Sequence, residues 1–311
     1  MRRQQLGIFA IALLAILACD KVSDIGNGYV DNVSFVIDRL TPVGDIVPQT
    51  RTTMNADEND FVWSARDTIG IYPDTGSQVY FVTPSGQQTG SATFDGGGWS
   101  FKESSTYSCY YPFVGDIYLK RNRVPASFEG QKQTGTSDYS HIGRHHYMYT
   151  DPTRAANGSL SFALHHLSCF IRPKLTLPAG TYTKLAIVAP EPVFVKKGYF
   201  DLTASPCSII PTEMTDQLQI DLEGITLTQE TTFRVYLASA PVNLAEKEIT
   251  ICVLDNQRKE RQCKKTPSVA FNLAAGALAG LTCNTWTEVP QSMGLILEDW
   301  GDGGSIGGSA D

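Results

Sequence analysis

Short stretches of alternating apolar and polar residues recur along most of the chain, and they predict strands rather than helices. The first covers residues 33–37, where Val33, Phe35 and Ile37 share one face of an extended segment. Similar segments follow at 68–72, 79–82, 92–94, 99–101 and 107–113, separated by turns rich in Gly, Pro and Asp. This succession is typical of an all-β protein.

A second series of strand-like segments begins near residue 160. Alternation is clear over 160–165 and 167–177, and further strands are expected at 184–189, 198–202, 217–222, 232–238, 248–254, 267–273 and 294–300. Residues 119–154 have no clear period and are expected to form long loops around brief strands, and the glycines of 274–280 favour a loop there. This spacing is typical of a β-sandwich. We therefore expect one β-sandwich domain over 30–160 and a second over 161–300.

Residues 1–18 have the features of an export signal. Arg2 and Arg3 precede an uncharged apolar run over 6–17, which is shorter than the roughly 20 residues that a membrane-spanning helix needs. The run ends at Cys19, and residues 16–19 resemble a bacterial lipobox, in which the cysteine is acylated and becomes the mature N-terminus. An ordinary signal peptide that happens to precede a cysteine is the alternative.

The charge of the chain excludes some partners. Its 311 residues carry a formal net charge of −7 at pH 7, and removal of 1–18 would take away two arginines as well. An acidic chain is unsuited to binding nucleic acid or docking electrostatically on anionic lipid. The tail 301–311 is rich in Gly and Ser, and we expect it to be disordered.

Six cysteines follow Cys19. An even number in an exported chain permits disulfides, but six cysteines allow fifteen pairings and the sequence does not choose among them. Cys252 and Cys263 flank a polar stretch, and a hairpin turning at Gln257–Arg258 would place them opposite each other. They are a candidate disulfide, and buried free thiols are the alternative.

Motifs of catalysis are absent from the sequence. It contains no G-x-S-x-G, no H-E-x-x-H and no P-loop, so we expect neither enzymatic activity nor a cofactor. The five histidines, at 141, 145, 146, 165 and 166, are the one cluster with metal-binding chemistry. Because His165 and His166 would point to opposite faces of a strand, no metal site is expected. One buried histidine and several exposed ones are expected instead.

Aromatic side chains offer a different chemistry, because they stack on sugar rings. The candidates are the tyrosines of 107–111 and the four tryptophans, Trp63, Trp99, Trp286 and Trp300. Most tryptophans of a β-sandwich belong to its core or its edges, which is the alternative interpretation.

Four features occur in a fixed order along the chain. They are the lipobox at Cys19 followed by a strand and Thr50-Arg51; the block 61–72, FVWSARDTIGIY; Ala92-Thr93-Phe94 with Tyr110-Tyr111-Pro112; and 162–167, FALHHL. In this order they resemble the fimbrillin-like lipoproteins of Gram-negative bacteria, the subunits of type V pili. One position departs from that family's block, because Arg66 stands where a glycine is usual.

The resemblance implies two tandem transthyretin-like β-sandwich domains and assembly by donor-strand exchange. In that scheme residues 19–51 are a lipid tether and N-terminal strand, removed as a propeptide by a protease that cuts after Arg51, with Arg39 as the alternative. The displaced strand would carry Val33, Phe35 and Ile37, and the donor strand of the next subunit would carry Leu295, Leu297 and Trp300. Removal of a core strand exposes apolar surface and an unpaired sheet edge, which another strand can occupy.

The resemblance also implies a function and a place in the cell. The chain would be a structural subunit or adhesin of a type V pilus, held at the outer membrane by acylated Cys19 and then incorporated in the fimbria. Its partners would be other pilus subunits and a receptor on a host or bacterial surface. The alternative is a cell-surface lipoprotein that binds glycans and does not polymerise.

Overall fold

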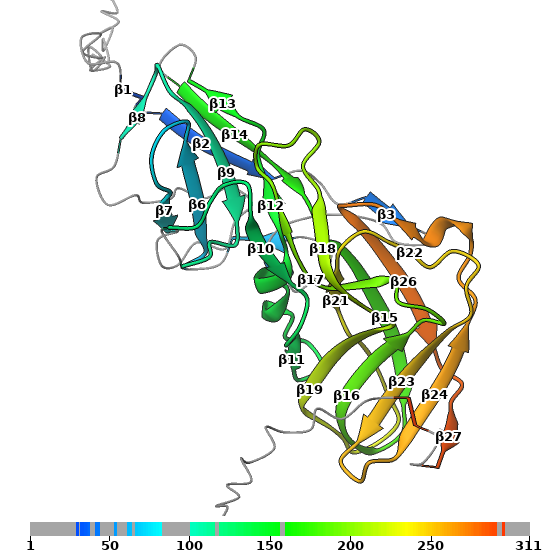
Figure 1. Ribbon diagram of the computed structural model, residues 1–311. Coiled ribbons are helices and arrows are strands. Elements are labelled where there is room, and N and C mark those ends of the chain that lie inside the picture. Colours follow the sequence, from blue (N-terminus) through cyan, green and yellow to red (C-terminus); the bar gives the residue numbers. More distant parts are fainter. Residues whose placement is uncertain are drawn as a thin grey trace, which may run out of the picture.

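The computed structural model describes residues 29–30, 32–37, 41–43, 53–54, 61–63, 66–82, 100–115, 118–155, 159–290 and 294–295. Within these ranges the regular elements are strands, apart from two short 3-10 helices, η1 (Ser140–His145) and η2 (Val269–Phe271). The strands form two main groups, at the upper left and the lower right of Figure 1. The predicted all-β fold is confirmed.

A seven-stranded sheet dominates the first group. Its strands, in spatial order, are β2 (Asn32–Ile37), β14 (Ser159–His166), β12 (Met148–Tyr149), β9 (Thr106–Tyr111), β6 (Thr68–Pro73) and β7 (Val79–Val82), with β13 (Thr153–Arg154) beside β9. Two small sheets accompany it, β1 (Tyr29–Val30) with β8 (Phe101–Lys102) and β4 (Thr53–Met54) with β5 (Phe61–Val62). Apolar side chains of β6, β9 and β14 share a core with Trp63 and Phe101.

The second group is a β-sandwich. One sheet has the order β11 (Lys132–Thr134), β19 (Gln217–Leu227), β16 (Gly180–Val188), β23 (Ile249–Asp255), β24 (Glu260–Lys265) and β27 (Thr287–Val289). The other has the order β20 (Thr231–Arg234), β15 (Cys169–Leu177), β26 (Ala277–Cys283) and β3 (Thr41–Val43), with β21 (Leu237–Ser239) beside β15 and a small sheet of β22 (Val242–Asn243) and β25 (Asn272–Leu273). Both large sheets contribute to one core, as Leu175 of β15 and Ile251 of β23 illustrate.

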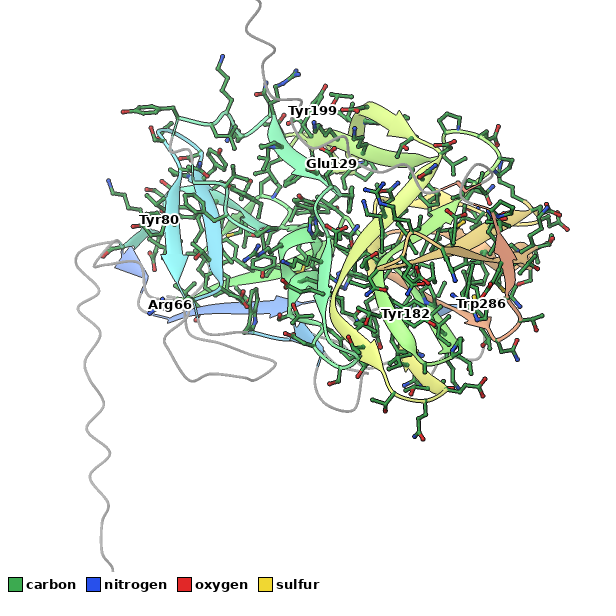
Figure 2. The ribbon with its side chains drawn as sticks, turned by 90° about the horizontal axis from the view of Figure 1, so that it is seen from below. Arg66, Tyr80, Glu129, Tyr182, Tyr199 and Trp286 are labelled. Carbon is green, nitrogen blue, oxygen red and sulfur yellow. The ribbon has the colours of Figure 1, made fainter. Side chains whose placement is uncertain are left out.

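A three-stranded sheet of β10 (Val124–Ser127), β17 (Phe194–Phe200) and β18 (Ile209–Thr215) lies between the two groups. Figure 2 shows Tyr80 on the side of the seven-stranded sheet, Trp286 on the side of the sandwich, and Glu129 between them. A second core joins all three regions, because Tyr110 of β9, Phe200 of β17 and Phe170 of β15 belong to it. The two main groups are therefore packed together rather than merely linked.

The chain passes from one group to the other at Leu167–Ser168, between the end of β14 and the start of β15. The boundary expected at 160–161 thus lies within β14. Within 119–154, the short strands β10 and β11 agree with the expected brief strands; β10 joins the three-stranded sheet and β11 joins the six-stranded sheet.

One strand of the sandwich contradicts its sequence-based assignment. Residues 277–283, expected to begin in a loop, form the internal strand β26, whereas the expected strand 267–273 contains η2 and is a strand only at its end, in β25. The first residues of β26 are buried on both faces, because Ala277 and Ala279 face the sandwich core while Leu278 faces the second core. Small residues fit such a site, and a strand buried on both faces shows no alternation.

The predicted disulfide between Cys252 and Cys263 is not formed. Both thiols are free and buried, and the register pairs Cys252 with Gln262, so that the two cysteines lie on opposite faces of the sheet. The prediction assumed a two-residue turn, whereas the N–H of Asp255 donates to the carbonyl of Lys259 across a three-residue turn. One extra turn residue shifts the register and reverses the face of each side chain. Cys263 instead contacts Cys283, and burial together with this neighbour raises the pKa of the Cys283 thiol.

Candidate functional site

The N-terminal segment supplies an edge strand to the seven-stranded sheet. β2 stands at one end of the strand order and pairs in parallel with β14. The register sets the three residues predicted for the displaced strand, Val33, Phe35 and Ile37, opposite three buried residues of β14, Leu160, Phe162 and Leu164. An edge strand has neighbours on one side, so it is the kind of strand that can leave a sheet with the least disruption.

Phe35 anchors this strand in the core. Its side chain is 4% exposed, and its ring stacks on that of Phe162 with the ring centroids 5.1 Å apart. Val33 is half-buried against the same core. Complete burial of a phenylalanine is worth roughly 1.5–3 kcal/mol, so loss of this strand would leave a substantial apolar surface uncovered.

A second strand of the N-terminal segment was not predicted from the sequence. β3 pairs in parallel with β26, with Thr41 opposite Ala277 and Val43 opposite Ala279, and it forms the edge of the five-stranded sheet. Pro42 in the middle of it is tolerated at an edge, where one side of the backbone lacks a ladder partner. A segment of three residues with a central proline shows no alternation that would have revealed it. The N-terminal segment therefore closes an edge in each of the two main groups.

Several predicted site residues lie outside the described residues. They are Cys19, Arg51, Leu297 and Trp300. Thr53 of β4 is the first described residue after Arg51.

Leu295, the first residue of the predicted donor strand, is held on the sandwich by its main chain. Its N–H donates to both carboxylate oxygens of Glu260, at 2.9 Å to Oε1 and 3.0 Å to Oε2. Its carbonyl accepts a hydrogen bond of 2.7 Å from Nε2 of Gln217. Sequence reasoning missed both partners, because neither belongs to a recognisable motif.

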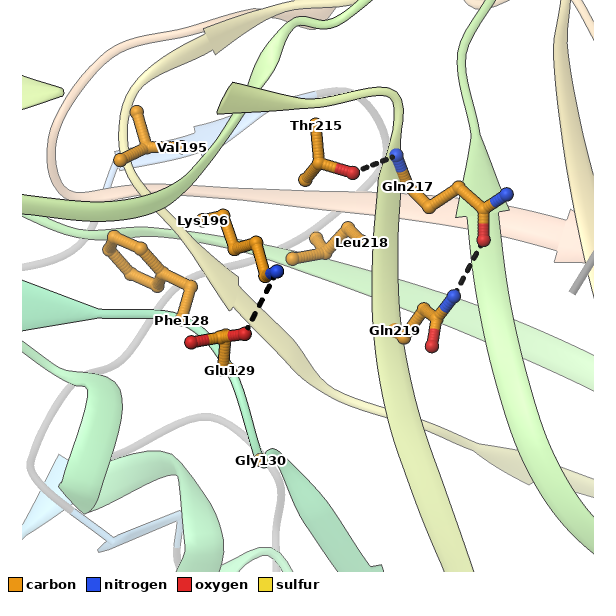
Figure 3. Close-up of a pocket in the computed structure, with 9 residues that line it drawn as sticks. All are labelled: Phe128, Glu129, Gly130, Val195, Lys196, Thr215, Gln217, Leu218 and Gln219. Carbon is orange, nitrogen blue, oxygen red and sulfur yellow. Dashed lines mark hydrogen bonds and ion pairs between the residues drawn. The ribbon is translucent and has the colours of Figure 1, made fainter. Parts of the chain in front are cut away.

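A cavity of about 220 Å³ lies beside Gln217, between β17, β19 and the residues that follow β10 (Figure 3). Within it, the N–H of Gln217 donates to Thr215 Oγ1 at 3.1 Å, and Gln219 Nε2 donates to Gln217 Oε1 at 2.6 Å. The first bond is made by the backbone of Gln217, and the second holds its side-chain amide by the oxygen, which leaves the amide nitrogen directed at the Leu295 carbonyl. Lys196 on the opposite wall pairs with Glu129 at 3.2 Å.

The aromatic residues proposed for sugar stacking are mostly core residues. Trp63, Tyr107, Tyr110 and Tyr111 are buried, and Trp286 is half-buried with its Nε1 donating to the carbonyl of Thr176 at 2.8 Å. Trp99 and Trp300 lie outside the described residues. The sequence pattern of 107–111 indicated a strand with one exposed face, whereas both faces of β9 are covered in the structure.

The expectation of several exposed histidines is wrong. His141, His145, His146 and His166 are buried. His141 Nε2 donates to the Tyr236 carbonyl at 2.8 Å, and His146 Nε2 shares a hydrogen bond of 2.7 Å with His166 Nδ1. Burial lowers the pKa of His141 to about 4, although its hydrogen bond to the Tyr236 carbonyl acts in the opposite direction, and burial together with His166 lowers the pKa of His146.

The described part of the chain contains no group of three or more His, Cys, Asp or Glu residues arranged to hold a metal ion. It also contains no helix that is long and apolar enough to cross a membrane. The most distinctive arrangement is thus one of strands: two N-terminal edge strands, and a C-terminal segment held by its backbone.

No protein-family model matches the chain, and no curated protein matches it. Two solved structures have a similar fold. A "putative cell adhesion protein" of Bacteroides ovatus superposes with a TM-score of 0.51 at 14% identity, covering 84% of this chain and 96% of its own. A second, from Bacteroides uniformis, gives a TM-score of 0.51 at 13% identity, covering 85% and 98%. The fimbrial anchor protein Mfa2 of Porphyromonas gingivalis gives 0.36 at 12% identity, covering 83% and 94%, a score too low to establish a common fold.

The first two similarities cover more than four fifths of this chain and nearly the whole of each solved structure. At such low identity they establish that the fold is shared, and this fold agrees with the predicted all-β sandwich class.

Proposed function

We propose that this protein is a structural subunit or adhesin of a type V pilus, exported as a lipoprotein and assembled by donor-strand exchange. Acylation of Cys19 would hold it at the outer membrane. Cleavage after Arg51 would release the N-terminal segment and commit the subunit to a fimbria.

The observation that carries this proposal is the position of the N-terminal segment at two sheet edges. β2 closes the seven-stranded sheet beside β14, and β3 closes the five-stranded sheet beside β26. Both pairings are parallel, and both strands precede Arg51. One cut after Arg51 would therefore separate β2 and β3 covalently from the rest of the protein. A sheet edge with an exposed apolar face is a strong template for a strand from another chain.

The fold and the sequence resemblance support the same function. Two solved structures that share the fold are named as cell adhesion proteins, and the motifs from Cys19 to residue 167 resemble fimbrillin-like lipoproteins. In the assembled fimbria, Leu295, Leu297 and Trp300 of one subunit would fill the groove that Val33, Phe35 and Ile37 of the next had vacated.

Limited digestion of the mature protein with an Arg-specific protease tests this function. We expect the first new N-terminus to be Thr52 and the cleaved protein to form multimers that resist SDS without boiling. Arg51→Gln should prevent both events, while Arg39→Gln should leave both intact. Leu297→Asp with Trp300→Asp should permit cleavage but abolish the multimers. Cleaved protein that stays monomeric at all concentrations would rule out assembly by this route.

A second function, glycan binding, is favoured by one observation on the seven-stranded side. Tyr118 is 82% exposed and lines a cavity of about 530 Å³ together with Asp74, Arg121 and Asn122. An exposed aromatic ring beside polar side chains is suited to stacking and hydrogen bonding with a sugar.

Binding to a glycan array distinguishes this second function. Tyr118→Ala should lower the signal on any glycan that binds, and Tyr80→Ala, which removes an exposed ring outside that cavity, should not. Equal binding by the two variants would exclude the cavity as the glycan site.

A further inference from the structure

The outer face of the six-stranded sheet carries a small apolar patch. The register aligns Gln219 of β19, Ala186 of β16, Cys252 of β23 and Gln262 of β24 in one row across the sheet. Ala186 and Cys252, in the middle of the row, form a cluster separate from the sandwich core, with Val188 and Leu254 packed against it. The row therefore faces away from that core.

This patch is covered although it lies on an outer face. Ala186 and Cys252 are fully buried. The Glu260 side chain covers part of the patch, because it is hydrogen-bonded to Cys252, and the main chain of Leu295 is hydrogen-bonded to the same carboxylate.

The main chain at Leu295 is held across this patch. Its carbonyl is bound by Gln217 of β19 and its N–H by Glu260 of β24. In the strand order, β16 and β23, which carry Ala186 and Cys252, lie between β19 and β24. The backbone of a residue held from both sides lies above the strands that carry the patch, while Leu295 itself remains 37% exposed.

Glu260 explains why the contact is specific. It is 2% exposed, and a buried carboxylate is costly unless its oxygens accept hydrogen bonds. The N–H of Leu295 satisfies both oxygens, and Nε2 of Gln262 donates to Oε1 at 2.7 Å. Gln217 and Glu260 thus form a clasp that recognises the backbone of an extended chain.

We propose that this outer face is a docking site for the C-terminal segment of the same chain, clasped at Leu295 by Glu260 and Gln217. The inference rests on the proposed function in one respect: Leu295 begins the segment that would be donated to a neighbouring subunit. Docking within the subunit and donation to a neighbour then compete for the same segment. Three hydrogen bonds over a small patch stabilise the docked segment less than burial of several large side chains would. The segment is therefore expected to bind preferentially in an empty groove on a neighbouring subunit.

Hydrogen exchange of the uncleaved mature protein tests the docking site directly. In the wild type the amide of Leu295 should exchange about tenfold or more slowly than an unprotected amide, because it is bound to a buried carboxylate. Glu260→Ala should remove this protection, and Gln217→Ala should reduce it while leaving Glu260 in place. Glu248→Ala is the matched control, since Glu248 is an exposed glutamate of the same region that pairs with Lys264. A melting curve for each variant confirms that the fold is retained.

The rate of multimer formation after cleavage tests the link to assembly. Glu260→Ala should form SDS-resistant multimers faster than the wild type, by about threefold or more, and Glu248→Ala should match the wild type. If Glu260→Ala removes the protection of the Leu295 amide but no variant forms multimers, the docking site is supported and the proposed assembly function is overturned. An unprotected Leu295 amide in the wild type would overturn the docking site itself, and protection that grows with protein concentration would assign the docked segment to a second copy.

Discussion

Phe35 is the residue through which the N-terminal strand enters a core. It is nearly inaccessible, and its ring lies against Phe162, which in turn packs against Phe101. Its contribution is therefore that of a core residue, although the strand that carries it is at an edge.

Phe35→Ala should lower the free energy of unfolding by about 3 kcal/mol or more, because it leaves a cavity beside Phe162. Urea unfolding of the uncleaved protein measures this. Tyr80→Ala is a control of similar size: Tyr80 is 53% exposed and stacks on Phe113, and we expect a loss of at most about 1 kcal/mol. Equal losses from the two variants would contradict the assignment of Phe35 to the core.

The buried histidines make the fold sensitive to acid. Burial lowers the pKa of His141 to about 4 and lowers the pKa of His145 and of His146. In the unfolded chain these side chains titrate near pH 6.5. Between these values the unfolded chain binds more protons than the folded one, so stability is complete above about pH 6.5 and declines as the pH falls toward 4.

Urea unfolding between pH 7.5 and 4.5 should show this decline. His146→Gln should weaken the dependence on pH, since it removes the histidine whose pKa is lowered by both burial and His166. His165→Gln is the matched control, because the His165 side chain is partly exposed. A stability that is flat across this range would show that the histidines are not neutral in the folded protein.

At the scale of elements, two short strands at sheet edges distinguish this chain. β2 and β3 both come from the N-terminal segment, yet they join different sheets. Processing at Arg39 or at Arg51 would therefore have different consequences, because Arg39 lies between the two strands and Arg51 follows both.

Two truncated chains separate these cases. A chain beginning at Leu40 keeps β3, and a chain beginning at Thr52 lacks both strands. In hydrogen exchange, peptides from 159–166 should lose protection in both chains relative to the full protein. Peptides from 277–283 should lose it only in the chain that begins at Thr52, because only there does β26 lose its edge partner. Loss in both chains would show that β3 does not stay in place without β2.

At the scale of the whole molecule, one shared core joins the seven-stranded sheet to the sandwich. Phe170 of β15 belongs to it, and its ring meets that of His146 at a centroid distance of 5.1 Å. Leu175, farther along the same strand, belongs to the sandwich core alone. A substitution at Phe170 therefore tests the coupling between the two groups of strands, and one at Leu175 tests the stability of the sandwich alone.

Calorimetry should show one cooperative unfolding transition for the wild type, because the shared core makes each group depend on the other. Phe170→Ala should separate this transition into two, while Leu175→Ala should lower its midpoint without dividing it. A divided transition in the wild type would mean that the shared core does not couple the groups.

The strands of the seven-stranded sheet show how far alternation alone carries a prediction. The segments 33–37, 68–72 and 160–165 lie in β2, β6 and β14, because each presents one apolar face to a core and the pattern of a strand is local. Gly70, in the block quoted for the family resemblance, lies opposite Tyr110, whose ring would overlap an added Cβ. The sequence shows that a glycine stands at this position, but the close approach of the Tyr110 ring that requires it is visible only in the structure.

What the sequence by itself determined is thus the all-β class, most strand positions and the edge segment that carries Phe35. Only the tertiary structure decided the partners. β26 and the buried histidines owe their environment to a core shared between sheets. One additional residue in the hairpin turn shifts the register and places Cys252 and Cys263 on opposite faces of their sheet. The clasp on Leu295 joins residues 217, 260 and 295, which a linear pattern cannot relate. These features depend on register and on contacts between distant segments, and local side-chain periodicity carries no information about either.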